Sequence, residues 1–343
     1  MPELPEVQTT VNGLNKKVKG LVIRDVWTDY NSPSKMNRDN IKSPAFFARF
    51  KKKLAGAKIV EASRRGKNIL IHVSKAGAKK SSSAHDATIL IHMKMTGHMM
   101  YGRYAFDAKK SARKERDPWS PVDNGPLKDP FNKFIHLVFS LSDAHGRDAG
   151  QLVLSDMRKF AKVTFIEKDI ADSNDKTQNA YLMRSLHLAG IGPEPLESSF
   201  TYDVIRIRLM KRPSGKIKTV LMTPEIIAGI GNIYSDEILW RAGVNPEERV
   251  ENVPEKKLRL IFDAIKSTLR KGIDFGGDSM SDYRNIDGER GTFQEQHNAY
   301  RKTGKPCSKP GCKGIIVRKM VGARSAHFCN VHQRLIGKAP KGK

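Results

Sequence analysis

The strongest constraint on how this chain folds is a set of four potential metal ligands near its C-terminus. Cys307 and Cys312 are separated by four residues, and Cys329 and His332, which follow after sixteen more, are separated by two. Two close pairs joined by a span of hairpin length suit a tetrahedral zinc site. The three cysteines of this 343-residue sequence make a poor disulfide framework. We therefore predict a β-hairpin zinc finger that holds one structural Zn²⁺, in preference to free or buried thiols beside an unrelated histidine.

The predicted finger is strongly basic. Residues 301–343 contain twelve Lys or Arg and no Asp or Glu, so a DNA-contacting element is more plausible than a neutral staple. His327 competes as a metal ligand, but strand alternation would place it on a strand beside Cys329 rather than at the turn.

The charge of the whole chain indicates a polyanionic partner. Lys and Arg number 62 against 36 Asp and Glu, a formal net charge of +26, while 38% of the residues are hydrophobic and can form real cores. Basic side chains gain affinity by releasing counterions from phosphates. The sequence has no apolar run of 18 residues and no cationic signal peptide. We expect a monomer in the cytoplasm (nucleoid-associated if bacterial) that is neither secreted nor membrane-bound.

The hydrophobic pattern predicts an α+β protein. Val7, Val11, Leu14 and Val18 have the spacing of one buried helix face. Residues 21–167 contain short strand-like runs bounded by turn residues, which favours an antiparallel β-sandwich or barrel. Helical patterns follow from about residue 179. We predict four regions: a catalytic helix and β-sandwich domain at 1–168, a helical domain at 179–295, the finger at 297–337 and a basic tail at 338–343.

The N-terminus could carry chemistry. If Met1 is removed, Pro2 presents a free secondary amine, and a terminal amine is substantially neutral, hence nucleophilic, at physiological pH. Such an amine can attack an aldehyde-like carbon and form an iminium, with Glu3 as the adjacent general acid and base. The simpler interpretation is that this segment merely starts a helix, with Pro and acids in its first turn.

Six segments of the chain form a recognisable set. They are MPELPEV at the N-terminus, RRGK at 64–67, IHMKMTG at 91–97, SDMRKF at 155–160, AGIGNIYSDEILWRAG at 228–243 and VGARSAHFC at 321–329. Together they resemble one family of repair enzymes, the oxidised-purine branch of the formamidopyrimidine-DNA glycosylase/endonuclease VIII family, and the resemblance runs from Met1 to about Gln333. The helical domain is thereby identified as similar to the family's helix–two-turns–helix domain.

The resemblance implies four catalytic residues. Pro2 corresponds to the nucleophile and Glu3 to the proton-transfer residue, with Glu6 in support. Lys67 inherits a role in elimination and in gripping phosphate. Arg324, five residues before the third metal ligand, would bind the phosphates flanking the lesion and assist the second elimination.

The resemblance also implies seven DNA contacts. A base leaves the stack at a cost of a few kcal/mol, which inserted side chains offset. Met95 and Phe160 would be apolar wedges, and Arg158 would pair with the orphaned base. The phosphate contacts would be His92, Lys159, Lys218 and Asn232. By themselves, these segments would pass for a basic surface loop, a strand face and a helix start.

Three positions depart from the family pattern. His332 stands where a fourth cysteine is usual, Met157 replaces a proline, and Phe134 stands where a phosphate-contacting histidine is often found. The loop at about 272–292 has the length and position of the loop that closes over flipped oxidised purines. It favours a purine-directed enzyme. Residues 107–133 are expected to form a long surface insertion.

The implied activity is bifunctional base-excision DNA repair. The enzyme would act on double-stranded DNA as a glycosidase (a hydrolase), removing formamidopyrimidines and 8-oxoguanine through a Schiff base on Pro2. It would then act as a lyase, cleaving the abasic site by β,δ-elimination. Two alternatives remain: a pyrimidine-directed endonuclease VIII-type glycosylase, and a non-catalytic zinc-finger DNA-binding protein whose charge and finger are its whole function.

Overall fold

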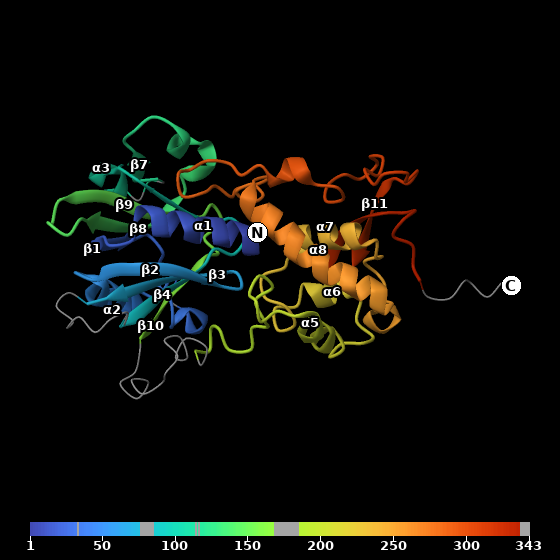
Figure 1. The fold of residues 1–343 in the computed structure, drawn as a ribbon. Helices are drawn as coiled ribbons and strands as arrows, with labels where there is room; N and C mark the ends of the chain where they lie inside the picture. Colours follow the sequence, from blue (N-terminus) through green and yellow to red (C-terminus); the bar gives the residue numbers. More distant parts are fainter. Residues whose placement is uncertain (33, 76–85, 114, 116, 168–184, 337–343) are drawn as a thin grey trace. The chain divides into compact units, whose positions relative to one another are not determined.

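The computed structural model describes the chain except for residues 33, 76–85, 114, 116, 168–184 and 337–343 (Figure 1). It has two compact units. The N-terminal unit comprises Met1–Pro2, Glu6–Ala189 and Gly276–Gly291, and the C-terminal unit comprises Glu3–Pro5, Gly190–Phe275 and Thr292–Lys343. Residues 179–184, where the predicted helical domain begins, and the predicted basic tail at 338–343 lie outside the described residues. Among the helices that are described, none combines the length and apolar character that crossing a membrane requires.

This division differs from the predicted domain boundaries at three places. Residues 276–291 and the described residues 185–189, both predicted to belong to the helical domain, are part of the N-terminal unit, and Glu3–Pro5 are part of the C-terminal unit. The units are defined by contacts between residues far apart in the sequence, which hydrophobic periodicity cannot reveal.

The first helix forms as its periodicity predicts. Helix α1 (Leu4–Lys17) has Glu6 in its first turn and two lysines in its last, as the helix dipole favours. The four apolar residues at helical spacing, Val7, Val11, Leu14 and Val18, are 0–3% exposed. They enter the core of the N-terminal unit.

The predicted strands pair as one antiparallel sheet of eight, in the order β10-β4-β3-β2-β1-β8-β9-β5. Every one of these strands contributes buried residues to a single core, and the antiparallel sheet confirms the predicted α+β fold of this unit. The strands are β1 (Val22–Thr28), β2 (Lys58–Arg65), β3 (Asn68–Ser74), β4 (Ala87–His92), β5 (His98–Gly102), β8 (Ile135–Ser142), β9 (Asp148–Ser155) and β10 (Lys162–Glu167).

Some elements of this unit were not predicted. Helix α2 (Pro44–Leu54) begins at Ser43, whose Oγ accepts from the Phe46 N–H, and buries only Phe50 and Leu54. Its three consecutive lysines concealed this narrow apolar face. The predicted insertion 107–133 is also ordered in its described part. In and next to it are β6 (Tyr104–Phe106), α3 (Ala108–Ala112), β7 (Trp119–Pro121) and the 3-10 turns η2 (Pro126–Lys128) and η3 (Pro130–Asn132). A further 3-10 turn, η1 (Lys35–Asn37), lies between β1 and α2 in the sequence.

The C-terminal unit is helical and ends in a hairpin, as predicted. Its helices are α5 (Tyr202–Leu209), α6 (Ile217–Leu221), α7 (Asn232–Ala242) and α8 (Glu255–Asp274), with short turns η5 (Val250–Asn252) and η6 (Phe293–Gln296). Helix α8 packs along α7 (Figure 1), and both contribute to one apolar core. Strands β11 (Ile316–Val321) and β12 (Arg324–Cys329) form the hairpin, with Val321 opposite Arg324.

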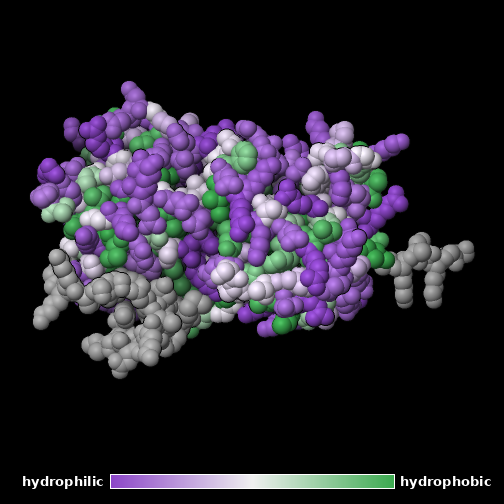
Figure 2. All heavy atoms as spheres, viewed as in Figure 1, coloured by the Kyte–Doolittle hydropathy of each residue, from purple (hydrophilic) through white to green (hydrophobic). Residues whose placement is uncertain are grey.

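Hydrophilic side chains dominate the face drawn in Figure 2, in keeping with a net charge of +26.

Candidate functional site

The N-terminal segment is held by the start of α7. Glu3 is 2% exposed, and its carboxylate accepts backbone N–H bonds from Gly231 (2.6 Å), Ile233 (2.8 Å) and Tyr234 (3.4 Å). The Leu4 N–H donates to the Gly229 carbonyl at 3.0 Å. Glu3 therefore supplies the partners that the first N–H groups of a helix lack, where its negative charge also suits the helix dipole.

Gly229 and Gly231 leave room for the N-terminal segment, because a side chain at either position would collide with it. A Cβ on Gly231 would lie 2.4 Å from the Glu3 Cδ, and one on Gly229, whose φ is +85°, would lie 2.7 Å from the Leu4 Cβ. This explains the GIGN sequence before α7: glycine lets the N-terminal segment approach the helix start. Pro2, the predicted nucleophile, is buried next to this anchor in the chain.

Lys67 and His92 lie beside each other in the N-terminal unit. Lys67 is in the two-residue turn between β2 and β3, where Gly66 has a φ of +57°, a value that hairpin turns of this length require. His92 pairs with Asn68, the residue after that turn. Burial, with the charges of Lys94 and Lys67, lowers the pKa of His92 to about 3. His92 is therefore a neutral imidazole. Its Nδ1 accepts the Lys94 N–H, which leaves Nε2–H as a donor.

The predicted wedge residues lie on two loops and are exposed. Met95 follows β4 and is 37% exposed, and Phe160 precedes β10 and is 47% exposed. The Arg158 guanidinium carbon lies 4.5 Å from the centre of the Phe160 ring. This cation–π contact holds the two side chains against each other.

A buried carboxylate ties these two loops together. Asp156 is fully buried and accepts hydrogen bonds from Tyr30 Oη (3.2 Å), the Ala161 N–H (2.7 Å) and Thr96 Oγ1. Thr96 is the residue after Met95, and its Oγ1 also accepts the Arg158 N–H at 3.2 Å. The Met95 loop and the Arg158–Phe160 loop are thus both held by hydrogen bonds to the Asp156 carboxylate and the Thr96 hydroxyl.

Lys159 is held away from the wedge. Its φ is +53°, and its Nζ donates to Asp29 at 2.9 Å. Burial would raise the pKa of Asp29, but hydrogen bonds from His136 and Lys159 outweigh it and lower that pKa. His136 thus stabilises the carboxylate that holds Lys159.

Lys218 departs from expectation. We predicted a phosphate contact, but its side chain is fully buried and forms an ion pair with Asp236, which is also fully buried. Its Nζ lies 3.2 Å from Ser235 Oγ and 3.3 Å from the Asn232 carbonyl. A buried cation needs such partners, and they occupy the ammonium that would have met the phosphate. Asn232, the other predicted phosphate contact in this region, is half-buried at the start of α7.

The four predicted metal ligands come together. Cys307, Cys312, Cys329 and His332 place their ligand atoms within 4.8 Å of one another. Cys312 Sγ lies 3.6 Å from Cys329 Sγ, and Cys307 Sγ lies 3.4 Å from His332 Nδ1. Tetrahedral bonds of roughly 2.3 Å to sulfur and 2.1 Å to nitrogen give edges of roughly 3.5–3.8 Å, so the cluster fits a metal ion.

The imidazole is oriented from behind. His332 Nε2 lies 3.1 Å from the Trp240 carbonyl, so Nε2–H donates and Nδ1 faces the cysteines, the usual arrangement of ligand histidines. Burial lowers the pKa of His332, which favours the neutral form that binds metal. His327, the competing candidate, instead bonds Asp236 through both its backbone N–H and its Nδ1 at 2.9 Å. Arg324 is exposed at the start of β12.

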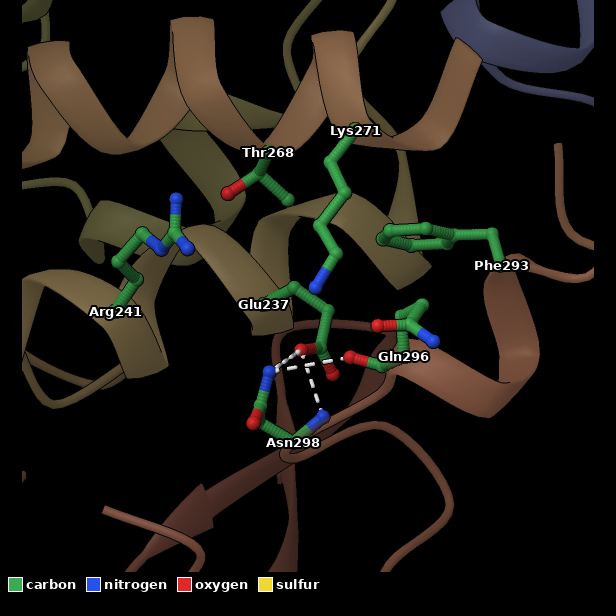
Figure 3. A pocket seen from close by; sticks show the side chains of 7 residues that line it. All are labelled: Glu237, Arg241, Thr268, Lys271, Phe293, Gln296 and Asn298. Atoms are coloured by element: carbon green, nitrogen blue, oxygen red, sulfur yellow. Dashed lines mark hydrogen bonds between the residues drawn. The ribbon is translucent and has the colours of Figure 1, made fainter. Parts of the chain in front are cut away.

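A small pocket between α7, α8 and the segment after η6 is structural. Glu237 points across it at Asn298, with Lys271 and Phe293 on its other sides (Figure 3). The Glu237 carboxylate accepts the N–H groups of Asn298, Ala299 and Tyr300, each at 2.9 Å. The cavity of about 20 Å³ has room for a single water molecule. Through these hydrogen bonds, Glu237 attaches residues 298–300, which precede the β11–β12 hairpin in the chain, to α7.

An antiparallel sheet with two exposed loops and a helical unit with a zinc-finger-like hairpin are the architecture of a class of DNA-repair glycosylases, and comparison with known proteins places the chain in that class. The family model described as the formamidopyrimidine-DNA glycosylase N-terminal domain matches residues 1–163, and the model of its H2TH domain matches residues 191–284. The chain belongs to the formamidopyrimidine-DNA glycosylase family.

Relatives extend this similarity over the whole chain. The formamidopyrimidine-DNA glycosylase of Pelotomaculum thermopropionicum is 31% identical over 98% of this chain and 100% of its own length. That of Bacillus subtilis is 32% identical over 96% of this chain and 98% of its own.

Solved structures agree. The Lactococcus lactis Fpg in complex with DNA containing an abasic site has a TM-score of 0.71 and 29% identity, covering 97% of this chain and 99% of its own. MutM in complex with DNA containing carbocyclic 8-oxo-G has the same TM-score and identity, covering 97% and 100%.

Sequence reasoning missed Asp156 and the Trp240 carbonyl. Asp156 lies inside the SDMRKF segment, and an acidic residue among basic and apolar ones at a strand end could have suggested an anchor. The backbone carbonyl of Trp240 leaves no trace in the sequence.

Proposed function

We propose that this protein excises oxidised purines from double-stranded DNA and then cleaves the resulting abasic site. The observation that carries the proposal is the anchoring of Glu3 at the α7 N-terminus. These hydrogen bonds fix the carboxylate of the residue that follows Pro2 in the chain, and an amine nucleophile and its proton carrier must act together.

In the proposed reaction, Met1 has been removed and the Pro2 nitrogen attacks C1′ of a flipped nucleotide. The N–C1′ bond forms as the bond from C1′ to the base breaks, and the base leaves with a proton from water. The Glu3 carboxylate takes the Pro2 N–H proton and passes it to O4′ as the C1′–O4′ bond opens, which leaves an iminium between C1′ and Pro2. Glu3 then accepts a C2′ proton as the 3′ phosphate leaves, and loss of the C4′ proton in a second elimination expels the 5′ phosphate. Water hydrolyses the iminium and frees Pro2. We assign charge stabilisation at these phosphates to Lys67 and Arg324.

The exposed loops would maintain the flipped state. Met95 and Phe160 would fill the vacated stack, and Arg158 would pair with the orphaned base. As a neutral donor through Nε2, His92 would bind a phosphate oxygen, and Asn232 and Lys159 would bind others. Lys218 would not contact the phosphate itself but would donate to the Asn232 carbonyl and so position Asn232. Lys159 must leave Asp29 to act.

We propose that the Cys₃His cluster holds one structural Zn²⁺. Three thiolates and one imidazole are a set of ligands typical of structural zinc, and the separations between the ligand atoms suit it. The bound metal would fix the β11–β12 hairpin that carries Arg324. Histidine in place of the fourth cysteine still supplies a competent ligand.

Oxidised purines are the proposed substrate class for two reasons. Relatives that match nearly the whole chain are named formamidopyrimidine-DNA glycosylases, and a solved structure with the same fold holds DNA with carbocyclic 8-oxo-G. Segment 276–291 is ordered on the N-terminal unit, consistent with the loop expected to close over purines.

Borohydride trapping on a panel of duplexes tests the proposal. The wild-type protein should form a covalent adduct with duplexes containing 8-oxoguanine or formamidopyrimidine and with abasic duplexes, and much less with thymine glycol. The Pro2→Gly variant should lose most of this adduct. Adduct at the wild-type rate in that variant would refute the nucleophile assignment. Preference for thymine glycol would instead establish the pyrimidine-directed activity.

Two further measurements separate catalysis from DNA binding. Intact mass shows whether Met1 has been removed, and a retained Met1 would block the amine and favour the non-catalytic alternative. The Glu3→Gln variant keeps an amide oxygen that can accept from Gly231 or Ile233, so α7 should stay capped while proton transfer is lost. Normal stability with impaired base excision is the expected result.

A further inference from the structure

The last part of the 107–133 region contacts the 276–291 segment within the N-terminal unit. The turn η3 begins at Asp129, which caps it by accepting the Phe131 N–H at 2.9 Å. We call residues 129–132 the bracing turn.

A charged pair makes the first link. The Arg284 side chain is 3% exposed and that of Asp129 24%. Arg284 Nε and Nη2 donate to the two Asp129 carboxylate oxygens at 3.0 and 3.1 Å. Its Nη1 donates to the Ser281 and Tyr283 carbonyls at 3.1 and 2.9 Å. The guanidinium thus binds backbone carbonyls of its own segment. It also forms a bidentate ion pair with the bracing turn, the geometry that makes such pairs strong.

A buried amide makes the second link. Asn132 is 1% exposed, and its Nδ2 donates to the Pro126 carbonyl at 2.9 Å and the Gly288 carbonyl at 3.1 Å. Its Oδ1 must therefore accept from His98 Nε2, 2.9 Å away. Burial lowers the pKa of His98 to about 4, so the ring is neutral and donates through Nε2.

The segment held in this way lies on α1. The Asp278 N–H donates to Glu6 Oε1 at 2.8 Å, and Tyr283 Oη donates to the Glu6 carbonyl at 3.0 Å. Ile286 is 3% exposed in the shared core, where a Cβ on Gly13 would lie 2.4 Å from it. Glu6 is in the first turn of the helix that follows Pro2, so the segment lies against the end of α1 that carries the proposed nucleophile.

We propose that Asp129 and Arg284 are positioning residues for base excision. The bracing turn holds segment 276–291 in place on the first turn of α1, so that the segment is already ordered when a flipped base arrives. This rests on the proposed function. A substrate that lacks a base needs no such support, so the pair determines the ratio of base excision to abasic-site cleavage and leaves abasic cleavage itself unchanged.

The test compares two conservative variants in the full-length protein. Asp129→Asn removes the charge with little change in shape. Asp123→Asn is the matched control, because Asp123 lies in the same region but pairs with the exposed Arg103, at 2.7 and 3.1 Å. Backbone hydrogen exchange is measured on the free proteins. Single-turnover excision is measured on 8-oxoguanine duplexes, and strand cleavage on preformed abasic duplexes.

For Asp129→Asn we expect faster exchange confined to the region around 276–291. We expect excision slowed about tenfold, as the loss of one charge from a largely buried pair implies, with abasic cleavage within about twofold of wild type. Asp123→Asn should match wild type in all three measurements.

Several results would overturn the proposal. Unchanged exchange and excision in Asp129→Asn would show that the pair holds nothing. Equal losses of excision and abasic cleavage, with exchange raised throughout the N-terminal unit, would reduce Asp129 to a general stabilising role. If the wild-type protein excises a pyrimidine lesion instead, the purine assignment fails, and the ratio is measured on that lesion. If it excises no base, the proposed function fails, and hydrogen exchange alone decides whether the brace exists.

Discussion

Replacing Thr96 by Val tests whether the Met95 loop and the Arg158–Phe160 loop both depend on hydrogen bonds to Thr96 and Asp156. Valine keeps the shape of threonine but cannot donate to Asp156 or accept the Arg158 N–H. Thr96 is 5% exposed and Asp156 fully buried, so water cannot replace the lost partner. Asp156 would keep Tyr30 and the Ala161 N–H as donors.

The expected cost follows from the kind of bond removed. A hydrogen bond to a buried charged group contributes about 1.5–3 kcal/mol, and valine leaves no cavity to add to this. We therefore expect the free energy of unfolding of the N-terminal unit to fall by about 2 kcal/mol, which lowers the Tm of a unit of this size by roughly 4–8 °C. Both loops should also loosen, and base flipping should slow.

Urea unfolding followed by tryptophan fluorescence measures the stability, since Trp27 and Trp119 both lie in the N-terminal unit. Fluorescence of 2-aminopurine placed beside a lesion measures flipping. Tyr30→Phe removes another donor to the same carboxylate, so the double variant should lose more than the sum of the single ones. A Thr96→Val protein within about 0.5 kcal/mol of wild type, with normal flipping, would refute this shared dependence.

Three further predictions concern other parts of the molecule. Stability should fall as the pH drops below about 6.5, because the unfolded chain then binds protons that buried His98, with its pKa of about 4, does not. The contribution is about 2 kcal/mol at pH 5, and a His98→Gln protein should show a flatter pH profile. Gly13→Ala places a Cβ 2.4 Å from Ile286 and should cost about 1–3 kcal/mol, seen as a lower urea midpoint; an unchanged midpoint would mean that Ile286 is not packed there. A chelator, or His332→Ala, should weaken DNA binding and open the β11–β12 hairpin to proteolysis, and resistance to both would remove the zinc assignment.

Local chemistry in the sequence carried much of the fold. The strands were predictable because short strand-like runs lie between Gly, Asn, Asp, Ser and Pro residues, and α1 because Val7, Val11, Leu14 and Val18 repeat with the helical period. Helix α2 was not predicted because only two of its residues, Phe50 and Leu54, are buried, and lysines separate them. The sequence spacing of Cys307, Cys312, Cys329 and His332 was sufficient to predict the cluster, since each pair of ligands is local.

The sequence by itself therefore determined the ligand set, the strand pattern, the basic charge and the resemblance to a glycosylase family. Tertiary structure alone decided which polar groups meet. Glu3 bonds to a helix 228 residues away, and Asp129 to an arginine 155 residues away. Likewise, Asp236 removes Lys218 from solvent. No local pattern encodes such pairs, because a buried charge finds its partner only after distant segments have packed and excluded water.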